Sequence, residues 1–132
     1  MKKIGLVLAA VVLLTGFAGT SLAATSLLGT WSGTGSCATP TGFTSLSATV
    51  KVLNQSVAGL FRGNVTGKVG ADAFAHGLTG YISGSQVRGN SYEGGGLAGL
   101  WEFTYAATVP PSLKGNVRGT DGTICSVTLR KK

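Results

Sequence analysis

Apolar and polar residues alternate along most of the chain after residue 26, in short segments separated by turns that contain glycine, serine or proline. In a strand, residues two apart share a face, so this alternation is typical of β-strands with one buried side. No long segment shows the 3.6-residue period of an amphipathic helix. The pattern predicts eight strands, at about residues 27–37, 45–55, 59–69, 73–83, 86–92, 99–109, 112–120 and 123–130.

Charged residues define the two faces of these predicted strands. In segment 59–69, for example, Phe61 and Val65 fall on one face, whereas Arg62 and Lys68 fall on the other. Every Lys, Arg and Glu of the strands follows this rule, and burying an unpaired charge is costly, so the apolar face is predicted to point inward. One ionisable residue breaks the rule, because His76 shares the apolar face of its strand with Phe74 and Leu78.

Eight antiparallel strands with short connections favour an up-and-down β-barrel, which closes on itself and leaves no exposed edge. A β-sandwich is the alternative. Cys37 ends the first strand and Cys125 lies near the start of the last, both at inward positions. The first and last strands of such a barrel run antiparallel side by side, so a Cys37–Cys125 disulfide is predicted to join them. No linker divides residues 24–132, which are predicted to form one domain.

The first 23 residues have the three parts of a secretory signal peptide. Lys2 and Lys3 precede an apolar core at 4–17 that is short for a membrane span, and Ser21 and Ala23 provide a small-residue cleavage site. We expect cleavage after Ala23 and export to the periplasm or the extracellular space, with no membrane span left; an uncleaved anchor is the alternative. Two cysteines in an exported chain favour a disulfide over a metal site.

The chain is basic, with 11 Lys and Arg residues against four Asp and Glu. Removing Lys2 and Lys3 from the formal charge of +7 leaves +5, spread along the sequence rather than in blocks. A scattered excess favours solubility and loose attraction to anionic surfaces, and it does not favour specific nucleic-acid recognition. Cations on the outward face also disfavour an outer-membrane barrel, whose outer face is apolar.

The sequence lacks the residue combinations of the common enzyme classes. Asp72, Glu93 and Asp121 fall in turns and Glu102 faces outward, so no pair of carboxylates is placed for acid–base catalysis. His76 is the only histidine, and no serine lies in a nucleophile motif. Neither a phosphate-binding loop nor a set of metal ligands is present. We therefore expect no catalytic activity, no metal and no cofactor.

The inward aromatic residues instead indicate a binding function. Together with His76 as a polar group, they could line a pocket for a small apolar or aromatic ligand, a combination that ligand sites commonly show. The candidate ligand-binding aromatic residues are Phe61, Phe74, Trp101, Phe103 and Tyr105. They could equally fill a narrow barrel, and the many inward glycines could either leave a cavity or permit tight coiling.

A second hypothesis uses the outward cations. An exported structural or interaction protein, of an adhesion or inhibitor type, could dock on an anionic envelope partner through this basic outer surface.

Gly29-Thr30-Trp31 resembles the Gly-x-Trp motif that opens the first strand of calycins, the group of lipocalins and avidin-like proteins. Calycins also pack a cationic residue from the end of the last strand over this tryptophan, and Arg130 occupies the matching place. Trp31 shares the inward face of its strand with Gly29, Gly33 and Gly35, so its ring is predicted to plug one end of the barrel while these small neighbours leave room for it. The resemblance implies a small ligand bound inside the barrel.

Overall fold

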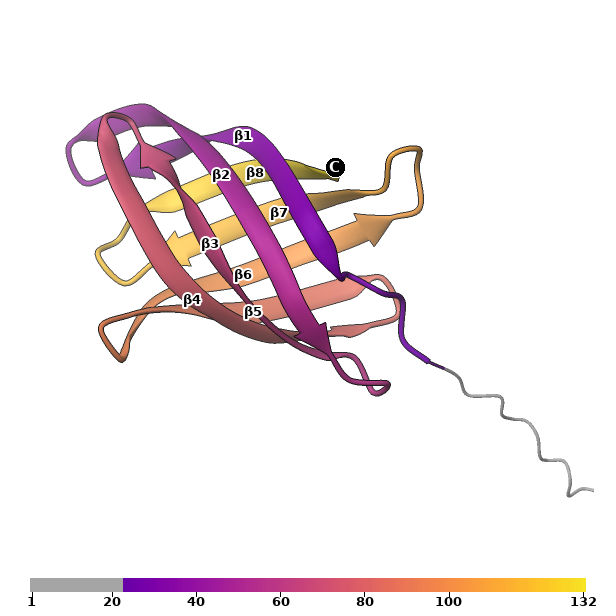
Figure 1. Cartoon of the computed structure of the whole chain (residues 1–132). Coiled ribbons are helices and arrows are strands. Elements are labelled where there is room, and N and C mark those ends of the chain that lie inside the picture. The colour runs from indigo at the N-terminus through magenta and orange to yellow at the C-terminus, as the bar shows by residue number, and fades with distance from the viewer. Residues whose placement is uncertain (1–22) are drawn as a thin grey trace, which may run out of the picture.

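The described chain forms a closed barrel of eight antiparallel strands in which each strand pairs with the next and β8 returns to β1 (Figure 1). The structure is a computed structural model that describes residues 23–132, so all of the predicted signal peptide except Ala23 lies outside the described residues. The strands are β1 (Gly29–Thr39), β2 (Gly42–Gln55), β3 (Leu60–Val69), β4 (Asp72–Ser83), β5 (Gln86–Glu93), β6 (Gly96–Ala106), β7 (Ser112–Gly119) and β8 (Ile124–Lys131).

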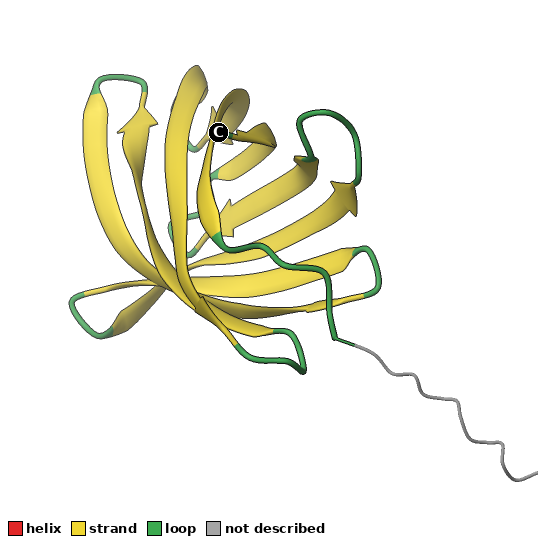
Figure 2. Ribbon diagram, turned by 45° about the vertical axis from the view of Figure 1, so that its right-hand side comes forward, coloured by secondary structure: helices red, strands yellow, loops and turns green. Residues whose placement is uncertain are grey.

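The predicted barrel is confirmed, and the alternative of a β-sandwich is wrong. Strands and loops alone make up residues 23–132 (Figure 2), and no helix in this range is long and apolar enough to cross a membrane. Several strands extend further toward their turns than the sequence predicts. Gly94 and Gly95, for instance, both have positive φ, at 58° and 85°, which lets β5 and β6 pair up to a two-residue turn.

The seam between β1 and β8 carries the predicted disulfide. Cys37 lies directly opposite Cys125 in the strand register, with a Cα–Cα distance of 4.0 Å, and their sulfur atoms are bonded. β1 continues two residues beyond Cys37 to Thr39, so the bond lies within the paired seam. The first and last strands of the barrel are therefore joined by both a hydrogen-bonded ladder and a covalent link.

Inward glycines allow the strands to coil tightly. A Cβ atom at Gly33 would overlap the carbonyl oxygen of Thr128 on β8, and one at Gly115 would overlap that of Glu102 on β6. A side chain at either position would push neighbouring strands apart, which is why a strongly coiled sheet has glycine there. The sequence allowed the inward glycines either to leave a cavity or to permit tight coiling, and Gly33 and Gly115 permit tight coiling.

One end of the barrel, which we call the closed end, is sealed by the chain that precedes β1. Leu27 and Trp31 are completely buried there. The Leu27 N–H donates to Gln55 Oε1 at 2.6 Å, and the Gln55 amide nitrogen donates to the Thr25 carbonyl at 2.7 Å. The Ala24 N–H donates to the Val57 carbonyl at 3.1 Å. Residues 24–28, part of which was predicted as strand, therefore cap this end instead.

Candidate ligand-binding cavity

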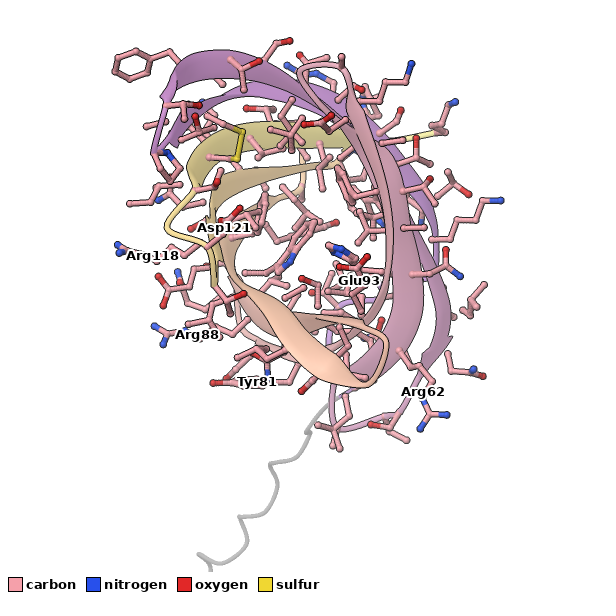
Figure 3. All side chains as sticks on the ribbon, turned by 90° about the vertical axis from the view of Figure 1, so that its left-hand side faces the viewer. Arg62, Tyr81, Arg88, Glu93, Arg118 and Asp121 are labelled. Carbon is pink, nitrogen blue, oxygen red and sulfur yellow. A yellow bond between two sulfur atoms is a disulfide. The ribbon has the colours of Figure 1, made fainter. Side chains whose placement is uncertain are left out.

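A cavity of about 840 Å³ occupies the opposite end of the barrel, which we call the open end. The turns at 40–41, 70–71 and 94–95 and the connection at 120–123 surround its mouth, and Figure 3 views the molecule from this side. Below the mouth, the wall is formed by inward side chains of β2 to β8. Its aromatic, aliphatic and small members are Leu46, Ala48, Val69, Phe74, His76, Ser91, Trp101, Val117 and Cys125.

Three of the predicted ligand-binding residues line this cavity. Phe74 and His76 are successive inward residues of β4, and their ring centroids are 5.2 Å apart. Trp101 extends from β6 into the wall of the cavity and stacks on Phe103, with 5.6 Å between the ring centroids. The structure therefore brings His76 together with two aromatic rings, as the first hypothesis requires.

The other three predicted residues do not line the cavity. Phe61 and Phe103 are buried in the hydrophobic core, and Tyr105 packs edge-on against Trp31 with 6.3 Å between ring centroids. Trp101, Phe103 and Tyr105 all point inward from β6, but each step of two residues moves about 7 Å along a strand. The alternation of apolar and polar residues identified the inward face correctly, but it does not show how deep in the barrel each inward residue lies.

Ser91 is a cavity residue that the sequence reasoning missed. It is 2% exposed and is the buried polar residue of the described chain. Ser91 shares the inward face of β5 with Val87 and Gly89, so the alternation that located Trp101 could have located it. It adds a hydroxyl group to a wall that is otherwise largely apolar.

The indole N–H groups of the two tryptophans differ in their partners. At the closed end, Trp31 Nε1 donates to the Leu27 carbonyl at 2.9 Å. Trp101 is 8% exposed, and its Nε1 is buried without any hydrogen-bond acceptor among the described residues. A buried donor without a partner is unfavourable, and because the Nε1 atom has almost no exposed surface it does not face the open cavity.

Two acidic groups at the mouth have defined neighbours. Glu93 Oε1 lies 3.7 Å from His76 Nε2, and Glu93 is far more exposed, at 74% against 18% for His76. The Thr123 backbone N–H donates to Asp121 Oδ1 at 2.9 Å, and this bond, helped by the Thr123 side chain, lowers the pKa of the Asp121 carboxyl. Asp121 is therefore negative at neutral pH.

The cation over Trp31 is Lys131 rather than the predicted Arg130. Lys131 Nζ lies 5.8 Å from the ring centroid, because Lys131 is the direct partner of Trp31 in the β1–β8 register. Arg130 pairs with Ser32 and is exposed on the outer face. Gly29, at φ 119°, leaves room for the Lys131 stem, since a Cβ there would lie 3.0 Å from Lys131 Cε.

Within residues 23–132, no group of three or more His, Cys, Asp or Glu side chains is placed to hold a metal ion. Comparison with known proteins adds no assignment to the site: no family model, curated protein or solved structure matches this chain.

Proposed function

We propose that this chain is an exported, calycin-like binding protein that captures one small apolar or aromatic molecule in the open-end cavity. The observation that carries the proposal is the cavity itself, of about 840 Å³ and lined by Phe74, His76 and Trp101. Sites for small molecules commonly span about 300–1,000 Å³ and combine apolar walls with a few polar groups. The disulfide and the signal-like N-terminus support export.

The architecture suits a container whose contents enter from one side. At the closed end, Leu27 and Trp31 seal the barrel, and a cluster of buried hydrophobic residues lies between the two ends. The disulfide ties β1 to β8 within the wall of the cavity, where Cys125 is itself a lining residue. A ligand would rest on Trp101 and against Phe74, and its apolar surface would be removed from water there.

Titration with N-phenyl-1-naphthylamine, an uncharged apolar probe whose fluorescence rises out of water, tests this function. We expect saturable binding of one probe per chain. Ala48→Phe is expected to weaken it by about tenfold or more, because the added ring occupies cavity volume. Ala48 is an inward residue of β2 and lines the cavity, so the added ring extends into the cavity.

Ser47→Phe is the matched control, since Ser47 is the exposed neighbour of Ala48 on the same strand. It adds the same ring to the outer face and is expected to leave probe binding unchanged. Equal binding by the two variants, or no saturable binding by the unmodified protein, would refute a ligand site in the cavity.

The outer surface favours a second candidate function, docking on an anionic envelope partner. A depression of about 980 Å³ lies at the outer face of β3 to β6, and the inward residues Phe61 and Trp101 form part of its lining. Arg62, Tyr81 and Arg88 also line it, and they lie on the outside of the barrel (Figure 3). Arg88 also lies 3.5 Å from Glu102, with both side chains more than half exposed. The titration separates the two candidates, because a protein that acts only through this surface has no saturable site for Ala48→Phe to block.

A further inference from the structure

The charges of the chain are distributed unevenly between the outer face and the cavity. The chain has 11 Lys and Arg residues and four Asp and Glu, yet no lysine or arginine is among the described residues that line the cavity. Three of the four acidic residues, Asp72, Glu93 and Asp121, do line it. The cavity is therefore the acidic part of a basic molecule.

The barrel topology brings these three carboxylates to one mouth. Asp72 begins β4, Glu93 ends β5 and Asp121 lies in the β7–β8 connection, so each comes from a different hairpin at the open end. The nearby cations Lys68 and Arg118 are exposed at outward positions of β3 and β7. Figure 3 shows Glu93 within the outline of the barrel and Arg118 on its outside.

Below the carboxylates, the cavity presents aromatic rings. Phe74 and Trp101 offer π faces, which attract cations as well as apolar groups.

We infer that the ligand is an apolar organic cation: a protonated or quaternary amine whose charge lies among Asp72, Glu93 and Asp121 while its apolar body rests on Phe74 and Trp101. This inference rests on the proposed function, since it specifies the ligand of the same cavity. It excludes fatty acids and other apolar anions as preferred ligands, because their carboxylates would lie beside the acidic mouth.

The net positive charge of the protein, taken alone, predicts a preference for anionic ligands, which is the opposite of the preference inferred for the cavity. The exported chain, with a formal charge of +5 after Lys2 and Lys3 are removed, attracts anions at long range. Within about 10 Å at ordinary ionic strength, however, the local carboxylates outweigh distant cations, whose field salt screens. Preference for a cation at the site would therefore reflect the mouth and not the overall charge.

Three probes with the same ring system measure this preference: 2-naphthylmethylamine, a cation at neutral pH, 2-naphthalenemethanol, which is uncharged, and 2-naphthoate, an anion. Their dissociation constants come from calorimetry or from displacement of N-phenyl-1-naphthylamine. We expect the amine to bind about tenfold more tightly than the alcohol, and the carboxylate to bind most weakly.

A triple variant, Asp72→Asn with Glu93→Gln and Asp121→Asn, removes the charge of the mouth while keeping the shapes of the side chains. It is expected to abolish the advantage of the amine and to leave the affinity for the alcohol unchanged. Glu102→Gln is the control, because Glu102 is exposed on the outer face and its loss changes the net charge by one without touching the mouth.

The possible negative results of the probe experiment overturn different parts of the account. If none of the probes binds the unmodified protein, the proposed function is overturned and this inference with it. If the alcohol binds as tightly as the amine, or the carboxylate binds best, the cation preference alone is overturned. A triple variant that binds all three probes equally poorly would also overturn it, because the carboxylates would then act on the shape of the mouth and not through their charge.

Discussion

Replacing both cysteines, Cys37→Ala with Cys125→Ala, is expected to lower the free energy of unfolding by about 3–5 kcal/mol. The disulfide links residues 88 apart in sequence, which removes much of the conformational freedom of the unfolded chain. It also spans the seam between β1 and β8, which is the longest-range pairing in the barrel. Urea unfolding of the oxidised protein and of the double variant, followed by circular dichroism, measures the difference.

The matched control is Ser36→Ala with Ser126→Ala. These serines are the adjacent cross-strand pair of the same seam, and they are exposed on the outer face. We expect this double variant to unfold within about 0.5 kcal/mol of the unmodified protein. If removing the cysteines destabilises the barrel no more than removing the serines, covalent closure contributes nothing to stability and the ladder alone holds the seam.

Trp31→Ala is expected to destabilise the protein by about 3–5 kcal/mol. The Trp31 side chain has 0% exposure, and it packs against Tyr105 at the closed end. Its loss leaves a cavity and also deprives the Leu27 carbonyl of its hydrogen bond from Nε1. Chemical unfolding of the purified variant provides the measurement.

Trp101→Ala is the comparison for the loss of stability expected in Trp31→Ala. Trp101 borders the existing cavity and its Nε1 makes no hydrogen bond within residues 23–132, so truncation breaks no polar contact there and extends a space that already exists. We expect about half the loss seen for Trp31→Ala. A larger loss for Trp101 than for Trp31 would show that the open end, and not the closed end, carries the stability of the barrel.

The architecture was predictable from the sequence because two independent patterns agree. The alternation gave the strands, and the exclusion of Lys, Arg and Glu from the apolar face showed which side is inward. The two cysteines then indicated closure, since their positions fit the neighbouring first and last strands of a barrel. In a barrel, the direction of each strand follows from the one before it, so few alternatives remained.

The location of the site was less predictable, because alternation gives the face of a residue and not its depth. Phe74 and Phe103 are both inward aromatic residues, yet one lines the cavity and the other belongs to the core. Which residue lies deep depends on the register between strands and on the capping segment 24–28. The register also determines that Lys131, and not Arg130, lies over Trp31, because the β1–β8 pairing places Lys131 directly opposite Trp31.

The acidic mouth was overlooked for a different reason. Asp72, Glu93 and Asp121 were each interpreted as a turn residue and are far apart in sequence. Alternate turns of an up-and-down barrel lie at the same end, so the topology alone would have placed these three acids together. Their relation to the cavity depended on which end Leu27 and Trp31 seal, and the capping segment was not recognised from its sequence.

The central claim is that a small molecule binds at the open end of the barrel, and the two tryptophans allow one measurement to test it. Trp101 borders the cavity and Trp31 lies at the closed end, so their indole N–H signals in a ¹H–¹⁵N spectrum report the two ends separately. Trp101→Phe assigns the signals. With saturating N-phenyl-1-naphthylamine, we expect the Trp101 signal to shift and the Trp31 signal to stay in place. A saturable probe that shifts only Trp31, or neither signal, would contradict binding in this cavity.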